Sequence, residues 1–242
     1  MPCYFVLHKP AGCITARRDH RGRSTVYDHV PPHYPCLPHV GRLDYNTEGL
    51  LLFTNDGRLA QALLNPDFGS GAGDGDGTGD GAGRPHVDKV YHVKLRGHLQ
   101  PDEPALLRLA EPLWHPEDRV WTRPARVRWY ARRSSADWVE VILDEGRSNQ
   151  VRLLCFRSGY QVVKLRRVAF GPLTLGDLRI RWCRPLTEEE VAACYALALP
   201  GEPRPPYVPI HDTPELLVEA RAARAAALAR GEEWQGPSHY WR

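Results

Sequence analysis

Asp44 is the acidic residue whose surroundings best suit catalysis. It follows Arg42 and Leu43 and precedes a predicted turn at residues 47–49, after which residues 50–53 form an unbroken apolar run. A turn anchored by a buried strand holds an acidic side chain rigidly and leaves it reachable, as a nucleophile or a general base requires. The sequence therefore predicts that Asp44 is a catalytic carboxylate.

Two other interpretations of this acidic segment stay open at this point. Asp44 could serve structure alone, by capping the turn through Thr47 and nearby backbone amides. It could also work with Glu48 in a two-carboxylate hydrolase, since such enzymes place two acidic side chains around the bond they cleave. The second pairing is the less expected one, because Glu48 lies only four residues away in the same predicted turn and has no clear partner.

The composition of the chain is that of an ordinary soluble protein. It has 242 residues, 42% hydrophobic and 25% charged, which is enough to bury a sizeable core. No apolar run approaches membrane-spanning length, and the six cysteines show neither a C-x-x-C pair nor zinc-site spacing. We therefore expect a cytoplasmic protein with reduced thiols, no bound metal, no organic cofactor and no membrane contact.

Basic residues gather in three places and are interleaved with aromatic residues. The formal net charge is only +3, so a local basic patch says more about a partner than the total charge does. Any one cluster is most simply a solvated face, but three such clusters favour an anionic polymer as the partner. The clusters are Arg17, Arg18, Arg21 and Arg23; Arg123, Arg126, Arg128, Arg132 and Arg133, around Trp121 and Trp129; and Lys164, Arg166 and Arg167.

The elements that must position these side chains are an irregular mixture of strands and helices. Apolar runs and alternating patterns predict strands, and helical periodicity with suitable start and stop signals predicts helices. The predicted strands cover residues 4–7, 50–53, 89–95, 120–130, 138–143, 162–168 and 178–182, with a hairpin turn at 134–137. The predicted helices cover residues 58–64, 101–109, 149–158, 187–199 and 214–230, the fourth with a capping box from Thr187 to Glu190. Because no regular βαβ alternation is present, we expect an α+β fold built on a mixed, mostly antiparallel sheet with flanking helices.

Residues 69–83 carry glycine at every odd position, with aspartate between several of them. The pattern superficially resembles a calcium-binding loop that starts at Asp74. Such a loop needs a bidentate glutamate at its twelfth position, where this chain has Pro85. We therefore interpret residues 69–86 as a flexible insertion in a catalytic domain of residues 1–200, followed by a tail of residues 201–242 that contains an amphipathic helix.

The spacing around Asp44 also resembles a known signature. The run G-R-L-D-x-x-T-E-G-L-L-L-x-T-N-D-G resembles the active-site motif of pseudouridine synthases, in the RsuA-type branch that modifies ribosomal RNA. Further segments resemble other motifs of this family in the same order, between residues 3 and 199. They are K-P-x-G at residues 9–12, K-V-Y at 89–91, E-G-R-S-N-Q-V-R at 145–152, L-x-R at 165–167 and R-P-L-T at 184–187.

The resemblance implies three catalytic residues and the family's fold. Asp44 would act covalently on the sugar or on the base, or would remove the 2′ proton of the sugar, and these routes stay open. Tyr91 would stack against the target base and offer its hydroxyl for proton transfer at carbon 5. Arg167 would pair with Asp44 and keep its carboxyl group ionised in a closed pocket. Taken singly, Tyr91 and Arg167 are more simply a cross-strand aromatic residue and a surface cation.

The same resemblance implies contacts to a flipped-out uridine and its flanking phosphates. The implied RNA-binding residues are Lys9, Arg17, Arg18, Arg42, Arg147, Gln150 and Arg152. The last three of these fit a scaffold role equally well, and Glu145 is expected to hold loop backbone. The chain departs from the family pattern at Leu153 and Ala169, where relatives carry basic residues, and both changes weaken the expected RNA contact.

The substrate implied by the resemblance is ribosomal RNA, with large-subunit RNA expected. Because the sequence starts at the first catalytic strand, we expect the short form of the family, without its N-terminal RNA-binding module. We also expect a monomer with a role in ribosome biogenesis. Two alternatives stay open: the same enzyme acting on transfer RNA, and a catalytically silent RNA-binding protein of the same fold.

Overall fold

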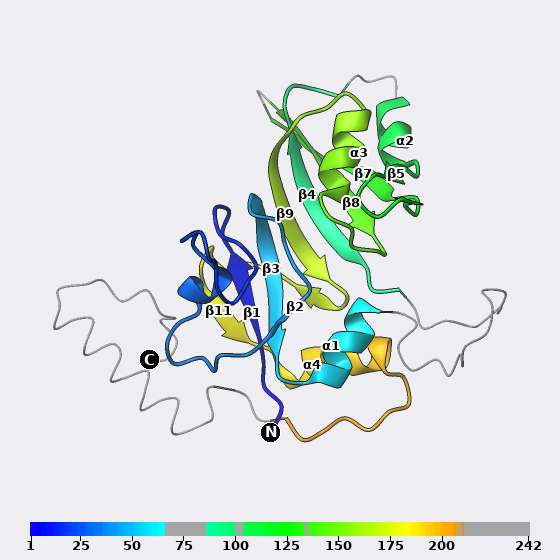
Figure 1. The fold of residues 1–242 in the computed structure, drawn as a ribbon. Coiled ribbons are helices and arrows are strands. Elements are labelled where there is room, and N and C mark those ends of the chain that lie inside the picture. The colour runs from blue at the N-terminus through cyan, green and yellow to red at the C-terminus, as the bar shows by residue number, and fades with distance from the viewer. Residues whose placement is uncertain (66–85, 100–103, 134–135, 208–209, 211–242) are drawn as a thin grey trace.

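The computed structural model describes residues 1–65, 86–99, 104–133, 136–207 and 210, which form a long sheet with helices packed on both faces (Figure 1). The strands are β1 (Tyr4–Lys9), β2 (His39–Val40), β3 (Thr47–Thr54), β4 (Lys89–Leu95), β5 (Trp114–His115), β6 (Val120–Trp121), β7 (Arg126–Arg133), β8 (Ala136–Leu143), β9 (Val162–Phe170), β10 (Leu173–Thr174) and β11 (Cys183–Pro185). The helices are α1 (Gly57–Leu64), α2 (Pro104–Ala110), α3 (Gln150–Arg157) and α4 (Glu188–Ala198), with a 3₁₀ turn at Val26–His29.

The main sheet has the strand order β11-β1-β3-β9-β4-β8-β7, with β2 added beside β3 and β10 beside β9. Within the described residues, β3 and β9 run parallel and the other pairs of this sheet are antiparallel. The strands β5 and β6 pair separately as a small hairpin. The expected α+β fold with a mixed, mostly antiparallel sheet is therefore confirmed.

The two faces of the sheet bury two clusters of apolar side chains. In β1, Tyr4 and Val6 belong to one cluster, and Phe5 and Leu7 belong to the other, because successive side chains of a strand point to opposite faces. The first cluster includes residues of α1 and α4, which lie side by side in Figure 1, and the second includes residues of α2 and α3. Burial on both faces explains why the central strands are continuously apolar.

Two helices begin at side chains that satisfy their first free amides. The Asp56 carboxylate accepts from the Leu59 N–H (3.0 Å) at the start of α1. At α4, the Thr187 hydroxyl accepts from the Glu190 N–H (3.2 Å), and the Glu190 carboxylate accepts from the Thr187 N–H (3.0 Å). The capping box predicted from the sequence is therefore confirmed.

The prediction of a turn at residues 47–49 is wrong, because these residues begin β3. The turn lies earlier, where the Thr47 N–H donates to the Asp44 carbonyl oxygen (3.0 Å). Gly49 has a φ of 120°, which suggests a turn when it is considered alone. Its pairing with Lys9 of β1 and with Arg167 of β9 places it inside the sheet.

Two further strand predictions are corrected. The predicted strand 120–130 is divided into β6 and β7, because Pro124 between them has no N–H to donate to a neighbouring strand. The predicted strand 178–182 is a turn, in which the Trp182 N–H donates to the Arg179 carbonyl (3.1 Å) and Arg181 adopts a φ of 69°. Residues 136 and 137 of the predicted hairpin turn belong to β8.

Some sequence predictions fall outside the described residues. The interpretation of the insertion at 69–86 lies almost entirely there, as does the helix predicted at 214–230. The division of the chain near residue 200 stays a prediction. Of the helices that the structure does describe, none combines the length and the apolar character needed to cross a membrane.

Candidate active site

Asp44, Tyr91 and Arg167, the three residues predicted to be catalytic, line the same pocket. The pocket has a volume of about 100 Å³ and lies between the loop before β3, the strands β4 and β9, and the start of α3. Asp44 comes from the loop, Tyr91 from β4 and Arg167 from β9. Their shared location is an observation, whereas their catalytic roles stay predictions.

The loop that carries Asp44 is fixed by the side chain of Lys9. Lys9 is completely buried, and its ammonium group donates to the carbonyl oxygens of Pro10 (3.0 Å), Asp44 (3.1 Å) and Thr47 (2.9 Å). An ammonium group has three N–H donors, so these carbonyls satisfy it. This bonding favours a structural role for Lys9, and its contact with RNA stays a prediction.

The Asp44 carboxyl group is partly buried, and this burial raises its pKa above the usual value of an aspartate. The positive charges of Arg152, Lys9 and Arg42, in decreasing order, act in the opposite direction. A hydrogen bond from the backbone N–H of Asn149 also favours the ionised form. The result is a carboxyl group that ionises at a higher pH than an exposed aspartate does, which suits a general base or a nucleophile.

The start of α3 contacts the Asp44 loop at two points. Asn149 precedes the helix with a φ of 53°, in the left-handed region, and its N–H faces the Asp44 carboxylate. The Arg152 guanidinium donates to the Asn46 carbonyl oxygen (3.1 Å). The family resemblance implied that Arg167 pairs with Asp44. This pairing is wrong, because Arg167 is not among the charges that act on Asp44 in the described part of the chain, and Arg152 exerts the largest favourable charge effect.

Arg167 is buried where β3 and β9 approach each other closely at Gly49. A Cβ atom on Gly49 would lie 2.1 Å from the Arg167 carbonyl oxygen. The Arg167 Nε donates to the Leu50 carbonyl (2.9 Å), and its Cζ lies 5.1 Å from the centre of the Phe170 ring. Burial lowers the pKa of Arg167, and the nearby Tyr91 hydroxyl acts in the opposite direction. The Arg167 Nη2 makes no hydrogen bond with a described residue, which leaves a donor for a ligand in the pocket.

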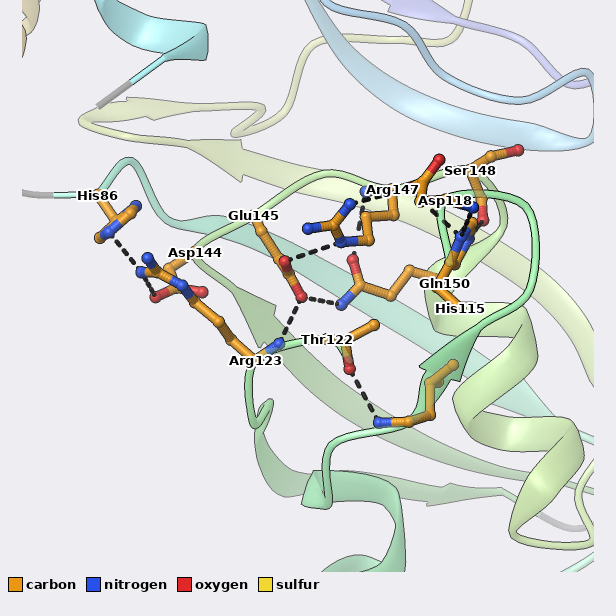
Figure 2. Close-up of polar contacts among 11 residues, drawn as sticks. His86, His115, Asp118, Thr122, Arg123, Asp144, Glu145, Arg147, Ser148 and Gln150 are labelled. Carbon is orange, nitrogen blue, oxygen red and sulfur yellow. Dashed lines mark hydrogen bonds and ion pairs between the residues drawn. The ribbon is translucent and has the colours of Figure 1, made fainter. Parts of the chain in front are cut away.

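A hydrogen-bond network centred on Glu145 fixes the segment that leads into α3 (Figure 2). The Glu145 carboxylate accepts from the Arg123 N–H (2.7 Å), the Gln150 amide (2.7 Å) and the Arg147 Nε (3.1 Å). The expectation that Glu145 holds loop backbone is confirmed. The Gln150 side chain is buried and both of its polar ends are bonded within the protein, which favours a scaffold role for it. Its contact with RNA stays a prediction.

The other predicted RNA-binding residues lie at or near the surface. Arg17, Arg18 and Arg42 are exposed, and Arg147 and Arg152 are partly exposed. Arg147 is already paired with Glu145 (3.1 Å) and Asp118 (2.9 Å), which favours a scaffold role for it. Contacts of these arginines to RNA stay a prediction.

Glu48 is not a second carboxylate of the pocket. It lies in β3 and forms ion pairs with Arg166 (3.0 Å) and Lys164 (3.2 Å) of β9. It therefore has clear partners, contrary to the sequence-based expectation, and it is absent from the pocket lining. The arrangement offers no support for a two-carboxylate hydrolase.

Lys89 also lines the pocket, although it was not among the site residues predicted from the sequence. Burial, followed by repulsion from the Arg167 charge, lowers its pKa to about 8. Its ammonium group donates to the Val87 carbonyl (3.2 Å) and lies 5.7 Å from the centre of the Phe170 ring. Lys89 is the first residue of the K-V-Y motif, in which only the tyrosine was predicted to have a role.

The arrangement suits a planar, neutral ring held beside one carboxylate. Tyr91 and Phe170 supply aromatic surface, Arg167 and Lys89 supply donors, and Asp44 supplies a carboxylate. Among the described residues, no cluster of three or more His, Cys, Asp or Glu side chains is arranged to hold a metal ion.

Comparison with known proteins gives consistent matches along most of the chain. A model of the RNA pseudouridylate synthase family matches residues 3–156. The ribosomal large subunit pseudouridine synthase B of Bacillus subtilis (strain 168) is 33% identical over 83% of this chain and 75% of its own length. An uncharacterized RNA pseudouridine synthase of Aquifex aeolicus (strain VF5) is 32% identical over 83% of this chain and 73% of its own length. A crystal structure of a pseudouridylate synthase aligns with a TM-score of 0.62 at 28% identity, over 80% of this chain and 74% of that one.

Proposed function

The chain belongs to the RNA pseudouridylate synthase family, in its RsuA-type branch, and from this premise we propose that it isomerises specific uridines of ribosomal RNA with Asp44 as the catalytic carboxylate. The observation that carries the proposal is the pocket in which Asp44 lies with Tyr91 and Arg167. Large-subunit RNA is the proposed substrate, because relatives named for that substrate are about one-third identical to this chain.

The reaction is an isomerisation, so its atoms balance without a co-reactant. The bond between the sugar carbon C1′ and the base nitrogen N1 breaks, and a bond from C1′ to the base carbon C5 forms. The proton on C5 leaves and N1 gains a proton. Asp44 acts on the sugar carbon, on the base, or on the sugar's 2′ proton, and each route requires the ionised carboxylate.

The neighbours of Asp44 are suited to hold the detached base while it turns. The Tyr91 ring offers a face for stacking, and its hydroxyl lies beside the Arg167 guanidinium. The unused donor of Arg167 can bind an oxygen of the uracil ring, and the guanidinium supports negative charge that develops there. The target uridine must leave its stack to enter a pocket of this size, which is the base-flipping mode of other enzymes that modify bases.

The test is tritium release from large-subunit RNA labelled at carbon 5 of uridine, because loss of the C5 proton accompanies the new bond. Asp44→Asn should lower the rate by at least about 10³-fold, while circular dichroism and thermal melting show an intact fold. Asp177→Asn, the same change at an exposed aspartate of the described chain, is the matched control and should keep full activity. Full activity of the Asp44→Asn variant would end the assignment.

The identity of the RNA is tested by parallel reactions with large-subunit RNA and transfer RNA transcripts. The proposal requires pseudouridine in the ribosomal transcript. Pseudouridine in transfer RNA alone would replace the proposed substrate and keep the proposed chemistry. RNA binding with no isomerisation of either transcript, together with indifference to Asp44→Asn, would identify a catalytically silent protein.

A further inference from the structure

An apolar groove lies between the β5–β6 hairpin and α3, outside the catalytic pocket. Its volume is about 330 Å³, and its lining residues are Leu113, Trp114, Pro116, Trp121, Leu153, Phe156 and Arg157. Three of its aromatic side chains are largely exposed: Trp114 by 49%, Trp121 by 64% and Phe156 by 80%. Exposed aromatic side chains gathered at one groove mark a binding surface more often than they mark simple tolerance of apolar groups by solvent.

We propose that this groove binds unpaired bases of the substrate RNA next to the target uridine, with Trp121 and Trp114 as stacking faces. The inference rests on the proposed function and adds a second contact region for the same RNA. The two tryptophan rings meet edge to face, with centres 6.0 Å apart and planes at 66°. Trp121 is the more exposed of the two rings and therefore the one that a base can reach more easily.

Hydrogen bonds and an ion pair join the hairpin to the segment that leads into α3, at the rim of the pocket (Figure 2). The His115 Nε2 lies 2.8 Å from the Ser148 carbonyl oxygen, and the Asp118 carboxylate pairs with Arg147 (2.9 Å). The Arg123 N–H donates to Glu145 (2.7 Å). These contacts join the hairpin to residues 145–148, next to Asn149 at the pocket, so RNA bound in the pocket would lie near the aromatic surface.

The groove and the catalytic pocket lie close together along α3. Gln150 at the start of the helix lines the pocket, whereas Leu153 and Arg157 line the groove. These positions share one face of a helix, since they are three and seven residues apart. At about 1.5 Å per residue the two sites are separated by roughly 5 to 11 Å along the axis, which a stacked strand spans in about two to three nucleotides.

The arginines beside the groove form ion pairs with acidic side chains of the protein. Arg157 at the groove is paired with Glu111 (3.5 Å), and Arg147 at its pocket side is paired with Asp118 (2.9 Å). These arginines are therefore already neutralised by carboxylates of the protein. A base bound in the groove would be held through ring faces, and its contribution to affinity should be nearly independent of salt.

The test compares Trp121 variants in tritium release from labelled large-subunit RNA. Trp121→Ala should raise KM about tenfold or more and leave kcat unchanged, because the lost stacking is remote from the reacting atoms. Trp121→Phe should recover most of the affinity, and Trp121→Leu should not, since leucine is apolar but has no π face. The dependence of KM on salt should keep its slope in all three variants.

The matched control is Leu107→Ala, which removes an exposed apolar side chain of α2 that lies outside the groove and should leave KM within about twofold. A KM of Trp121→Ala equal to that of the unsubstituted protein would overturn the proposal and leave the groove as a surface for a protein partner. Equal losses in the Phe and Leu variants would overturn stacking. If the unsubstituted protein releases no tritium from any RNA, the proposed function itself fails, which is a separate result.

Discussion

The strands at the two ends of the main sheet differ in how many of their residues are buried. At one end every residue of β1 is buried, and all but one residue of β3 are buried as well. At the other end β4 alternates between buried and partly exposed residues, and most of β7 is exposed. A cross-strand charge row starts in β3 and continues into this second end, with one residue from each of five neighbouring strands: Glu48, Arg166, His92, Glu140 and Arg128.

The pocket lies where these two ends meet, at the parallel pair of β3 and β9. The buried end holds the Asp44 loop through Lys9, and the more exposed end supplies Tyr91 and the start of α3 with Arg152. The Asp44 carboxylate is thus anchored in the more buried part of the molecule and bounded by the part that meets solvent. We therefore expect substitutions at the junction of the two ends to destabilise the protein most, and substitutions on the exposed face to destabilise it least.

The largest effect is expected from Gly49→Ala, which breaks the junction itself. The added Cβ would lie 2.1 Å from the Arg167 carbonyl oxygen, and the residue would have to keep a φ of 120° that alanine avoids. We expect a loss of more than about 4 kcal/mol in the free energy of unfolding, enough to unfold much of the protein. Chemical denaturation or solubility on expression measures this.

Gly57→Ala is the matched control for that prediction. Gly57 is the first residue of α1, and a Cβ there meets no atom within 4 Å. The variant should be as stable as the unsubstituted protein or more stable by up to about 1 kcal/mol, because alanine favours the helix. If the two variants melted alike, the close approach at Gly49 would have no energetic weight.

A smaller effect is expected from Arg152→Gln, which removes a positive charge of α3 that acts on the Asp44 carboxylate. Burial raises the pKa of Asp44, and the Arg152 charge is the largest opposing influence. Removing that charge should raise the pKa of Asp44 further. Because only the ionised carboxylate reacts, kcat/KM falls as the pH decreases through this pKa, so the acid limb of the pH profile should move to higher pH.

The measurement is the pH profile of tritium release, compared among single variants of Arg152, Arg42 and Arg17. Arg42→Gln should move the acid limb in the same direction but less, since its charge is the weaker influence on Asp44. Arg17→Gln should leave the limb in place, because Arg17 is not among the groups that act on Asp44. An unmoved limb in Arg152→Gln would mean that Asp44 ionisation does not control the rate.

The smallest effect is expected from Arg128→Gln, at the outer end of the cross-strand charge row. The Arg128 side chain is 72% exposed, and solvent screens its pairing with Glu140. Glu140 keeps a second partner in His92 (3.4 Å). The melting temperature should change by less than about 2 °C, and any difference should vanish in high salt; a larger loss would show that the exposed end is as sensitive as the junction.

Much of this contrast could be predicted from residue patterns. The unbroken run Leu50, Leu51, Leu52, Phe53 predicted a strand buried on both faces, and the alternation from Lys89 to Leu95 predicted β4 with both of its bounds. The position of Asp44 in its motif located the pocket. These features depend on short-range periodicity and on ordered motifs, which a single sequence displays.

The remaining features depend on contacts that a single sequence does not display. Lysine is almost never buried, so nothing local indicates that three backbone carbonyls would surround the Lys9 ammonium group. The bond of Gln150 to Glu145 depends on the turn between them, which the sequence does not display. The β5–β6 hairpin has strands of two residues each, too short for any periodicity to predict.

The parallel pairing of β3 with β9 has a consequence for how the protein is made. Leu50 and Arg167, which are bonded across this pair, are 117 residues apart. At the usual pace of translation, roughly 6 to 23 seconds separate their emergence from the ribosome. Throughout that interval one edge of β3 lacks its neighbour and can recruit the wrong strand. During synthesis, β3 can therefore mispair until β9 has emerged from the ribosome.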